Sequence, residues 1–209
     1  MTITNGYVTL DQMVTEIGTG ADPSKGVAAE AAITAASRQI DDYTGRRFWR
    51  DAVVVAREFY ADDAGELMSM PGAVMDISTT TGLIVKLDDG DNGTFSRTLT
   101  INTDYVLTPA NAADDGEPFT SIRLVDGNYY FPRSSSGRPG VQVTARFGFT
   151  AVPSAIAQAC LIQSVLLYKA TDAAMGGLSF GDAGFMRVRG GLNPIAQTLV
   201  ERYRFASVA

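Results

Sequence analysis

The stretch IDDYTGRRFWRDAVVVAREF, residues 40–59, changes from one secondary-structure pattern to another. Up to this stretch, apolar residues recur at helical spacing from Ala28 to Thr44, and Gly45 stands where helices commonly end. At its far end, Val53, Val55 and Phe59 are β-branched or aromatic residues at every-second positions, with Arg57 between them, and this segment predicts a strand. The stretch therefore predicts that a helical part of the chain gives way to a β-rich part near residue 50.

The alternating pattern continues to about Thr150. Further strand candidates, separated by turn-forming residues, are Leu83–Leu87, Thr98–Ile101, Tyr105–Leu107, Ile122–Val125, Tyr129–Phe131 and Val141–Phe147. The acidic segment 88–93 predicts a hairpin loop between the first two of these. About seven short strands in roughly 100 residues predict an antiparallel sandwich or barrel.

Helical patterns flank this block on both sides. Thr9 and Gln12 have the spacing of a capping box, ahead of a short helix that ends before Gly18, whereas residues 19–26 predict a connection. Pro153 begins a helix that runs to about Ala170, and Asn193-Pro194 begin one that runs to about Arg204. The positions expected to face the core are Ile33, Ala36, Ile40 and Tyr43, then Ile156, Cys160, Gln163 and Leu167, then Ile195, Leu199 and Tyr203.

This order of patterns predicts an α+β fold, a small α-helical bundle with an inserted antiparallel β-sandwich or barrel. Residues 1–50 and 151–209 form the discontinuous bundle, which carries a C-terminal docking segment. Residues 51–150 form the inserted all-β module. We expect an Arg38–Asp42 pair on the second helix, four residues apart.

Charge is distributed unevenly along the 209 residues, whose formal net charge is −6. Residues 51–150 hold fourteen acids and seven bases, whereas residues 151–209 hold three acids and five bases. This asymmetry predicts different neighbours for different regions. The lone Cys160 excludes an intrachain disulfide, and the N-terminus lacks a signal-peptide pattern. We expect a soluble protein made in a reducing cytoplasm.

The usual residues of catalysis and metal binding are missing. The chain has no histidine, which removes the commonest general base and metal ligand. Phosphate-binding glycine motifs are absent as well. Segment 88–93 fails as an EF-hand, because its third position is Gly90 and its twelfth is Leu99. We therefore predict no catalytic residue, no cofactor, no metal and no enzymatic activity.

Charged clusters leave alternatives open. Residues 46–50, RRFWR, could touch phosphates and stack on bases, or could be a capped helix end whose aromatics enter the core. The arginines could also pair with acids of a neighbouring subunit. Arg187 and Arg189 form an exposed basic loop or a partner contact. The pairs Asp62-Asp63 and Asp114-Asp115 are metal or acid–base candidates, with exposed loop acids as the simpler interpretation.

Three stretches, taken in order, resemble the head–tail connector (head-to-tail adaptor) family of tailed bacteriophages. They are ASRQIDDYTGRRF at 36–48, Phe147-Gly148-Phe149 followed by Val152-Pro153, and Leu192-Asn193-Pro194 with Leu199 and Tyr203-Arg204. The opening Tyr7–Leu10 is also similar. The large acidic β block departs from shorter members of that family.

The resemblance implies a structural virion protein of the neck. Subunits form a ring, commonly a dodecamer, beneath the portal vertex. The ring extends the DNA channel and presents a docking surface for the next neck protein, a stopper, head-completion or tail protein. Genomic DNA passes without sequence-specific binding, and no membrane is involved. The family has no catalytic residues to carry over.

Two sets of residues are predicted to serve this assembly. The predicted portal-docking residues are Leu178, Phe180, Phe185, Met186, Arg187, Arg189, Leu192, Arg202 and Arg204. The predicted inter-subunit contact or structural turn comprises Asp41, Asp42, Arg46, Arg47 and Phe48.

Two alternatives compete with the adaptor. One is another neck or tail component, such as a head-completion or tail-terminator protein, which would be mostly β. The other is a carbohydrate-binding or carbohydrate-acting β module that uses Tyr129, Tyr130 and Phe131 as a sugar platform, against strand residues that face a core.

Overall fold

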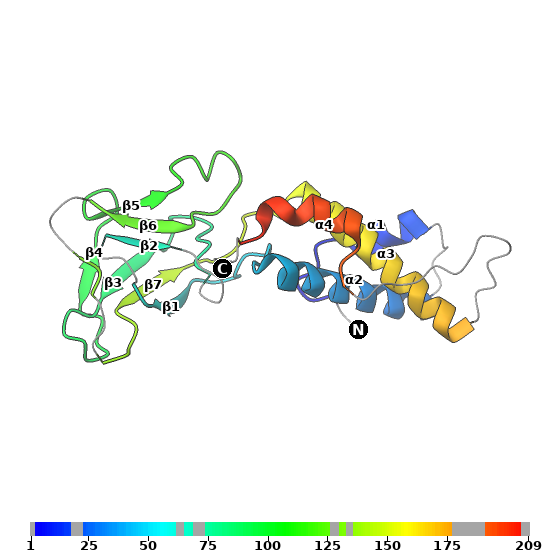
Figure 1. The fold of residues 1–209 in the computed structure, drawn as a ribbon, viewed down its shortest axis with the longest axis horizontal. Coiled ribbons are helices and arrows are strands. Elements are labelled where there is room, and N and C mark those ends of the chain that lie inside the picture. The colour runs from blue at the N-terminus through cyan, green and yellow to red at the C-terminus, as the bar shows by residue number, and fades with distance from the viewer. Residues whose placement is uncertain are drawn as a thin grey trace. The chain divides into compact units, whose positions relative to one another are not determined.

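The computed structural model describes residues 3–17, 23–61, 65–68, 74–125, 130–132, 136–176 and 191–205. Its fold is α+β, as predicted (Figure 1). The chain folds as two compact units, a helical unit, Met1–Phe48 with Val152–Ala209, and a β unit, Trp49–Ala151. Among the described residues, the helices are α1 (Leu10–Ile17), α2 (Pro23–Thr44), α3 (Ser154–Gly176), α4 (Pro194–Val200) and a 3₁₀ turn η1 (Glu201–Tyr203).

The helical unit is built around α3, which packs against α1, α2 and α4. Ile33, Ala36 and Ile40 of α2 and Ile156 and Cys160 of α3 are fully buried, as their spacing predicted. The capping box is confirmed, because Thr9 Oγ1 accepts from Gln12 N at 3.2 Å and Gln12 Oε1 accepts from Thr9 N at 2.8 Å. No helix within the described ranges is long and apolar enough to span a bilayer.

Two helix limits differ from the sequence prediction. Helix α2 begins at Pro23 rather than Ala28, so the predicted connection was too long. Proline has no N–H, and its fixed φ suits the first helical turn, where that N–H would find no intrahelical partner. Helix α3 continues to Gly176 rather than about Ala170.

The buried face of α4 also differs from the prediction. Ala196, Val200 and Tyr203 are buried, whereas Ile195 is 63% exposed. The predicted Ile195 and Leu199 and the observed Ala196 and Val200 have the same four-residue spacing and are displaced by one residue, whereas Tyr203 belongs to both rows. Periodicity alone therefore could not choose between them. Asn193 caps α4 as predicted, since its Oδ1 accepts from Ile195 N at 2.9 Å.

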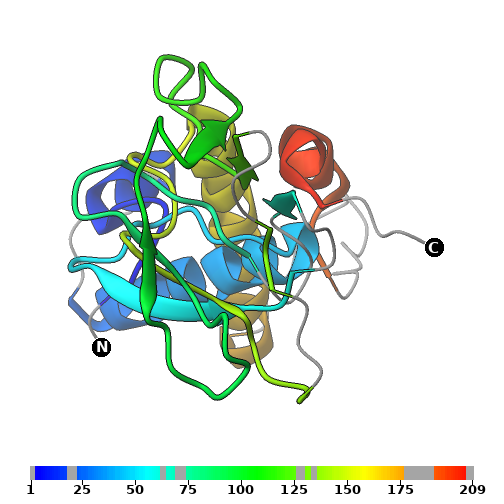
Figure 2. The same ribbon diagram turned by 90° about the vertical axis from the view of Figure 1, so that its left-hand side faces the viewer.

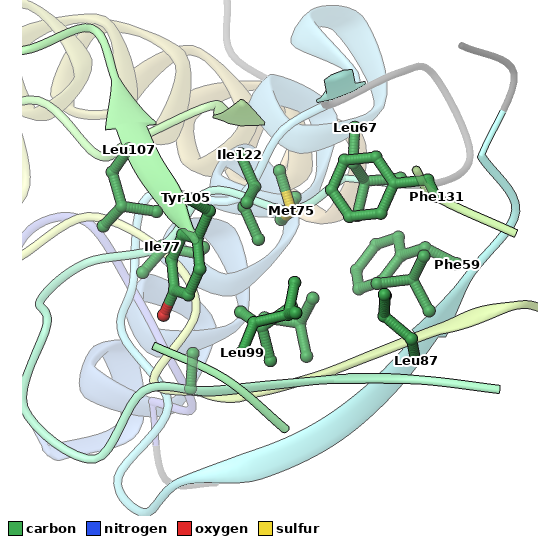
Figure 3. Close-up of a cluster of buried hydrophobic side chains, with 14 of the residues drawn as sticks. Phe59, Leu67, Met75, Ile77, Leu87, Leu99, Tyr105, Leu107, Ile122 and Phe131 are labelled. Atoms are coloured by element: carbon green, nitrogen blue, oxygen red, sulfur yellow. The ribbon is translucent and has the colours of Figure 1, made fainter. Parts of the chain in front are cut away.

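The β unit holds two antiparallel sheets (Figure 1, Figure 2). The described strands are β1 (Val55–Phe59), β2 (Glu66–Met68), β3 (Ile84–Leu87), β4 (Arg97–Leu99), β5 (Tyr105–Thr108), β6 (Ser121–Leu124) and β7 (Val141–Ala145). Their orders are β1-β7-β3-β4 and β2-β6-β5, and β3 and β4 form the predicted hairpin. Side chains from both sheets share one core (Figure 3).

Two strand predictions were wrong. Strand β2 was missed because its three residues offer a single buried apolar side chain, Leu67. Residues 130–132, which include part of the predicted strand Tyr129–Phe131, are not in a strand, and Tyr129 lies outside the described residues. Phe131 is nevertheless 1% exposed and points into the same cluster as Phe59 and Leu67 (Figure 3).

The two ends of the β unit lie against each other. Asp51 N donates to Phe147 O at 2.9 Å, and Arg57 pairs with Asp51 at 3.2 Å. Gly148 has a φ of +106°, and a Cβ there would lie 2.0 Å from Trp49 O. Only glycine permits this close approach of the segments that enter and leave the β unit.

Candidate interaction surface

The turn that follows α2 is fixed by short-range hydrogen bonds. Gly45 adopts a φ of +69° and its N–H donates to Asp41 O at 2.8 Å, which closes the helix as predicted. Thr44 Oγ1 donates to Ile40 O at 2.8 Å and accepts from Arg46 N at 3.3 Å. The Thr-Gly-Arg sequence thus ends the helix while keeping these backbone groups hydrogen-bonded.

Asp41 joins this turn to the N-terminal segment. The Tyr7 hydroxyl donates to Asp41 Oδ1 and accepts from Phe48 N at 2.9 Å. Arg38 pairs with Asp41 at 3.2 Å and donates to Asn5 O at 3.0 Å. The expected pairing of Arg38 with Asp42 is replaced by this one, because Asp41 faces Tyr7 and Arg38 while Asp42 is exposed.

Burial is the main cause of the raised pKa values of Asp41 and Tyr7. Partial burial raises the pKa of Asp41 to about 6, although the Tyr7 hydrogen bond and the Arg38 charge act to lower it. Burial and the neighbouring Asp41 charge also raise the pKa of Tyr7 above its usual value of 10.0. Tyr7 therefore stays protonated and donates to Asp41 at neutral pH.

Phe48 is a core residue of the helical unit. It is fully buried. The centroid of its ring lies 5.7 Å from that of Tyr7 and 5.4 Å from that of Tyr203, and both pairs pack edge to face. Of the five residues predicted as an inter-subunit contact or structural turn, Asp41 and Phe48 thus make contacts within the chain. Asp42 is exposed, and Arg46 and Arg47 are half-buried.

The C-terminal end of the helical unit packs against the same turn. Phe205 N donates to Thr44 O at 3.1 Å, and the Arg46 guanidinium lies 5.0 Å from the Phe205 ring. The Tyr43 hydroxyl donates to Glu201 at 2.5 Å, and the Arg204 guanidinium lies 5.2 Å from the Tyr43 ring. The Arg202 guanidinium lies 4.6 Å from the Tyr203 ring. We call these three arginines, Arg46, Arg202 and Arg204, together with Tyr43 and Phe205, the arginine patch.

The predicted portal-docking residues divide into three groups. Leu178, Phe180, Phe185, Met186, Arg187 and Arg189 lie outside the described residues. Leu192 is 8% exposed and belongs to the core. Arg202 and Arg204 are exposed. The sequence missed Ile195, the exposed aliphatic residue of α4, because the four-residue spacing placed it on the inner face.

A buried amide holds the chain where it enters α4. Gln163 of α3 is 1% exposed and was predicted to face the core. Its Oε1 accepts from Asn193 N at 2.9 Å, and its Nε2 donates to Gln39 Oε1 at 2.7 Å and to Gly191 O at 3.3 Å. Gln163 thereby fixes the segment that leads into α4.

The remaining candidates have structural surroundings. Cys160 is fully buried beside Ser37 and Ser164, and burial raises the pKa of its thiol, which disfavours the nucleophilic thiolate. Phe131 is buried, so a sugar platform that needs its exposed ring cannot form. Asp114 and Asp115 are exposed loop acids, whereas Asp62 and Asp63 lie outside the described ranges.

The carboxylates of the hairpin loop, residues 88–93, bind backbone N–H groups and an arginine of the same chain. Asp88, which is 1% exposed, accepts from Asn92 N at 3.3 Å and from Gly93 N at 2.6 Å. Asp89 pairs with Arg97 at 2.6 Å, and Asp91 accepts from Ser136 N at 2.8 Å. Where the structure describes the chain, no three Asp, Glu or Cys side chains gather as metal ligands would.

Comparison with known proteins gives a likeness of fold. No protein-family model and no curated protein matches the sequence. A chain in the neck of an empty gene transfer agent (GTA) particle, computed with C6 symmetry, has a TM-score of 0.55 and 19% identity. A chain in the virion of a native GTA particle has a TM-score of 0.52 and 18% identity. Each match covers 100% of this chain and 95% of the other. The whole fold, helical unit and β unit together, therefore occurs in an assembled particle.

Proposed function

We propose that this protein is a structural subunit of the neck of a phage-like particle, a head-to-tail adaptor without enzymatic activity. The observation that carries the proposal is the whole-length likeness to a chain in a GTA neck. The resemblance of residues 36–48 and of the closing Leu192–Pro194 segment to the connector family points to the same role.

In this proposal the subunits form a ring beneath the portal vertex. The GTA neck was computed with C6 symmetry, which rings of six and of twelve copies both obey. The ring extends the DNA channel and presents a surface to the next neck protein, a stopper, head-completion or tail protein. The family resemblance favours twelve copies.

An acidic subunit suits a conduit for DNA. Each phosphate contact made by a lysine or arginine adds affinity for DNA, which would slow its passage. The formal net charge of −6 opposes such binding. Weak binding of this kind lets the DNA move through the channel, and the adaptor role requires no sequence-specific contacts.

Attachment to the portal falls to the segment between α3 and α4. Its apolar residues Leu178, Phe180, Phe185 and Met186 provide anchors, and Arg187 and Arg189 provide charge. Buried Leu192 takes no part. Removing everything after Ala170 would be a poor test, because Ala196, Val200 and Tyr203 complete the core of the helical unit.

Charge reversal tests this attachment without opening the core. We expect the Arg187→Glu, Arg189→Glu double variant to bind DNA-filled heads about tenfold more weakly than the wild type, measured by co-sedimentation. Lys169→Glu, which reverses an exposed charge on α3, is the control and should bind like the wild type. Wild-type binding by a folded double variant would contradict the proposed attachment.

The other neck components are disfavoured by architecture. A head-completion or tail-terminator protein is expected to be mostly β, whereas four helices bracket the described strands here. The adaptor therefore remains the proposal that accounts for both units.

A further inference from the structure

The fold brings together arginines that the sequence analysis placed in two different predicted contacts. Arg46 was grouped with the turn after α2, and Arg202 and Arg204 with the portal. The hydrogen bond between Phe205 N and Thr44 O, at 3.1 Å, brings Arg46 and Arg204 to one surface. Arg46 lies over Phe205 and Arg204 lies over Tyr43. A partner that binds Arg204 at this surface would therefore also lie close to Arg46.

The chemistry of the patch favours an acidic protein partner. Arg202 and Arg204 are exposed, and Arg204 lies 3.5 Å from Glu201. Stacking on Phe205 and Tyr43 holds two guanidinium groups in place, which lowers the conformational entropy lost on binding. Planar, oriented guanidinium groups suit carboxylates.

The chain itself carries a complementary surface. Residues 51–150 hold fourteen acids and seven bases. Many of these acids bind donors within the unit, as Asp88 and Asp89 do, but Asp114 and Asp115 are exposed in the loop between β5 and β6.

This acidic loop is preformed. Asp114 N and Asp115 N both donate to Asn111 O at 3.1 Å, and Glu117 N donates to Ala112 O at 2.8 Å. Ala112, at 1% exposure, anchors the loop to the unit. Two carboxylates are thus presented on an ordered turn.

We propose that the arginine patch of one copy binds the Asp114-Asp115 loop of a second copy. Because the two surfaces differ, the contact is head-to-tail, the kind of contact from which a closed ring of identical subunits is built. The inference rests on the proposed ring and names the surfaces that hold neighbouring subunits together. It also reassigns Arg202 and Arg204 from portal docking to the contact between subunits.

Disulfide trapping tests the contact directly. The variants Arg204→Cys and Asp115→Cys are purified separately, mixed in equal amounts and oxidised, and the products are separated by mass. Because a disulfide needs its two cysteines within about 7 Å of each other, we expect the heterodimer to exceed each homodimer about tenfold. Buried Cys160 should stay unreactive. Thr171→Cys, at an exposed site on α3, replaces Arg204→Cys in the control mixture, which should give little heterodimer.

Charge reversal then tests the chemistry of the contact. Adding Arg46→Glu and Arg202→Glu to the Arg204→Cys variant should lower the heterodimer yield about fivefold, and adding Asp114→Lys to the partner should restore most of it. Raising the salt to about 0.5 M should lower the wild-type yield as well.

Several results would overturn the inference. A statistical mixture, with heterodimer about twice each homodimer, would show that the two surfaces do not meet. Failure of Asp114→Lys to rescue would exclude the charge pairing. Duplex DNA binding by the wild type that is lost with Arg46→Glu and Arg202→Glu would assign the patch to phosphates. These outcomes do not depend on whether the protein is found in necks, so the proposed function can fail separately.

Discussion

Asp41 is the residue where the N-terminal segment, α2 and the following turn meet. Its carboxylate accepts from Tyr7, pairs with Arg38, and has a pKa raised from 3.8 to about 6 by burial. The folded state therefore holds the Asp41 proton more tightly than the unfolded state does. The resulting stabilisation is complete below about pH 4 and is lost as the pH rises through 6.

Asp41→Asn should remove this pH dependence. The free energy of unfolding of the wild type, minus that of the variant, should fall by about 1–3 kcal/mol between pH 4 and pH 7. Urea unfolding at several pH values measures it, with the exposed Asp42→Asn as the control that should follow the wild-type profile. A constant difference across this range would contradict the assigned role of Asp41.

Gly148 is the residue on which closure of the β unit depends. A Cβ at Gly148 would lie 2.0 Å from Trp49 O, whereas one at Gly116 would have nothing within 4 Å, and both glycines have positive φ. We expect Gly148→Ala to lower the free energy of unfolding by more than about 3 kcal/mol, and Gly116→Ala by about 1 kcal/mol. Thermal unfolding followed by circular dichroism measures both. Equal losses of stability for the two variants would show that the close approach of Gly148 to Trp49 tolerates a side chain.

At the scale of elements, α4 is positioned by Gln163 of α3. Gln163→Leu would keep the side-chain volume but leave Asn193 N, Gly191 O and Gln39 without this partner. Because each buried unpaired group costs about 1 kcal/mol or more, we expect a loss of about 2–4 kcal/mol in the free energy of unfolding. Gln158→Leu, at an exposed site of the same helix, should cost less than about 0.5 kcal/mol. Urea unfolding measures both variants. Similar losses of stability for Gln163→Leu and Gln158→Leu would contradict the role of Gln163 in positioning α4.

The elements also show what the sequence could predict. Caps with a local mechanism, such as Thr9 with Gln12 and Asn193 with Pro194, were found because their signal lies within four residues. The face of α4 was misassigned because two rows with the same spacing differ only in what they meet in the folded chain. Tyr130 and Phe131 were expected to face a core as strand residues or to form a sugar platform. Phe131 is buried outside any strand and Tyr130 is 71% exposed, since burial alone does not require strand pairing.

At the scale of the molecule, the order helix, β block, helix followed from the change of apolar period near residue 50. The arginine patch could not be predicted, because Arg46 and Arg204 are distant in sequence and come to one surface only when η1 and Phe205 lie against the end of α2. Surfaces built from separate segments need the tertiary structure, whereas capping and periodic burial do not.

The copy number of the protein in isolated necks tests the central claim most directly. Native mass spectrometry of intact necks should show this chain as a ring, and twelve copies of 22.2 kDa would contribute roughly 270 kDa. Necks that contain only one or two copies of the chain, or none, would contradict the account.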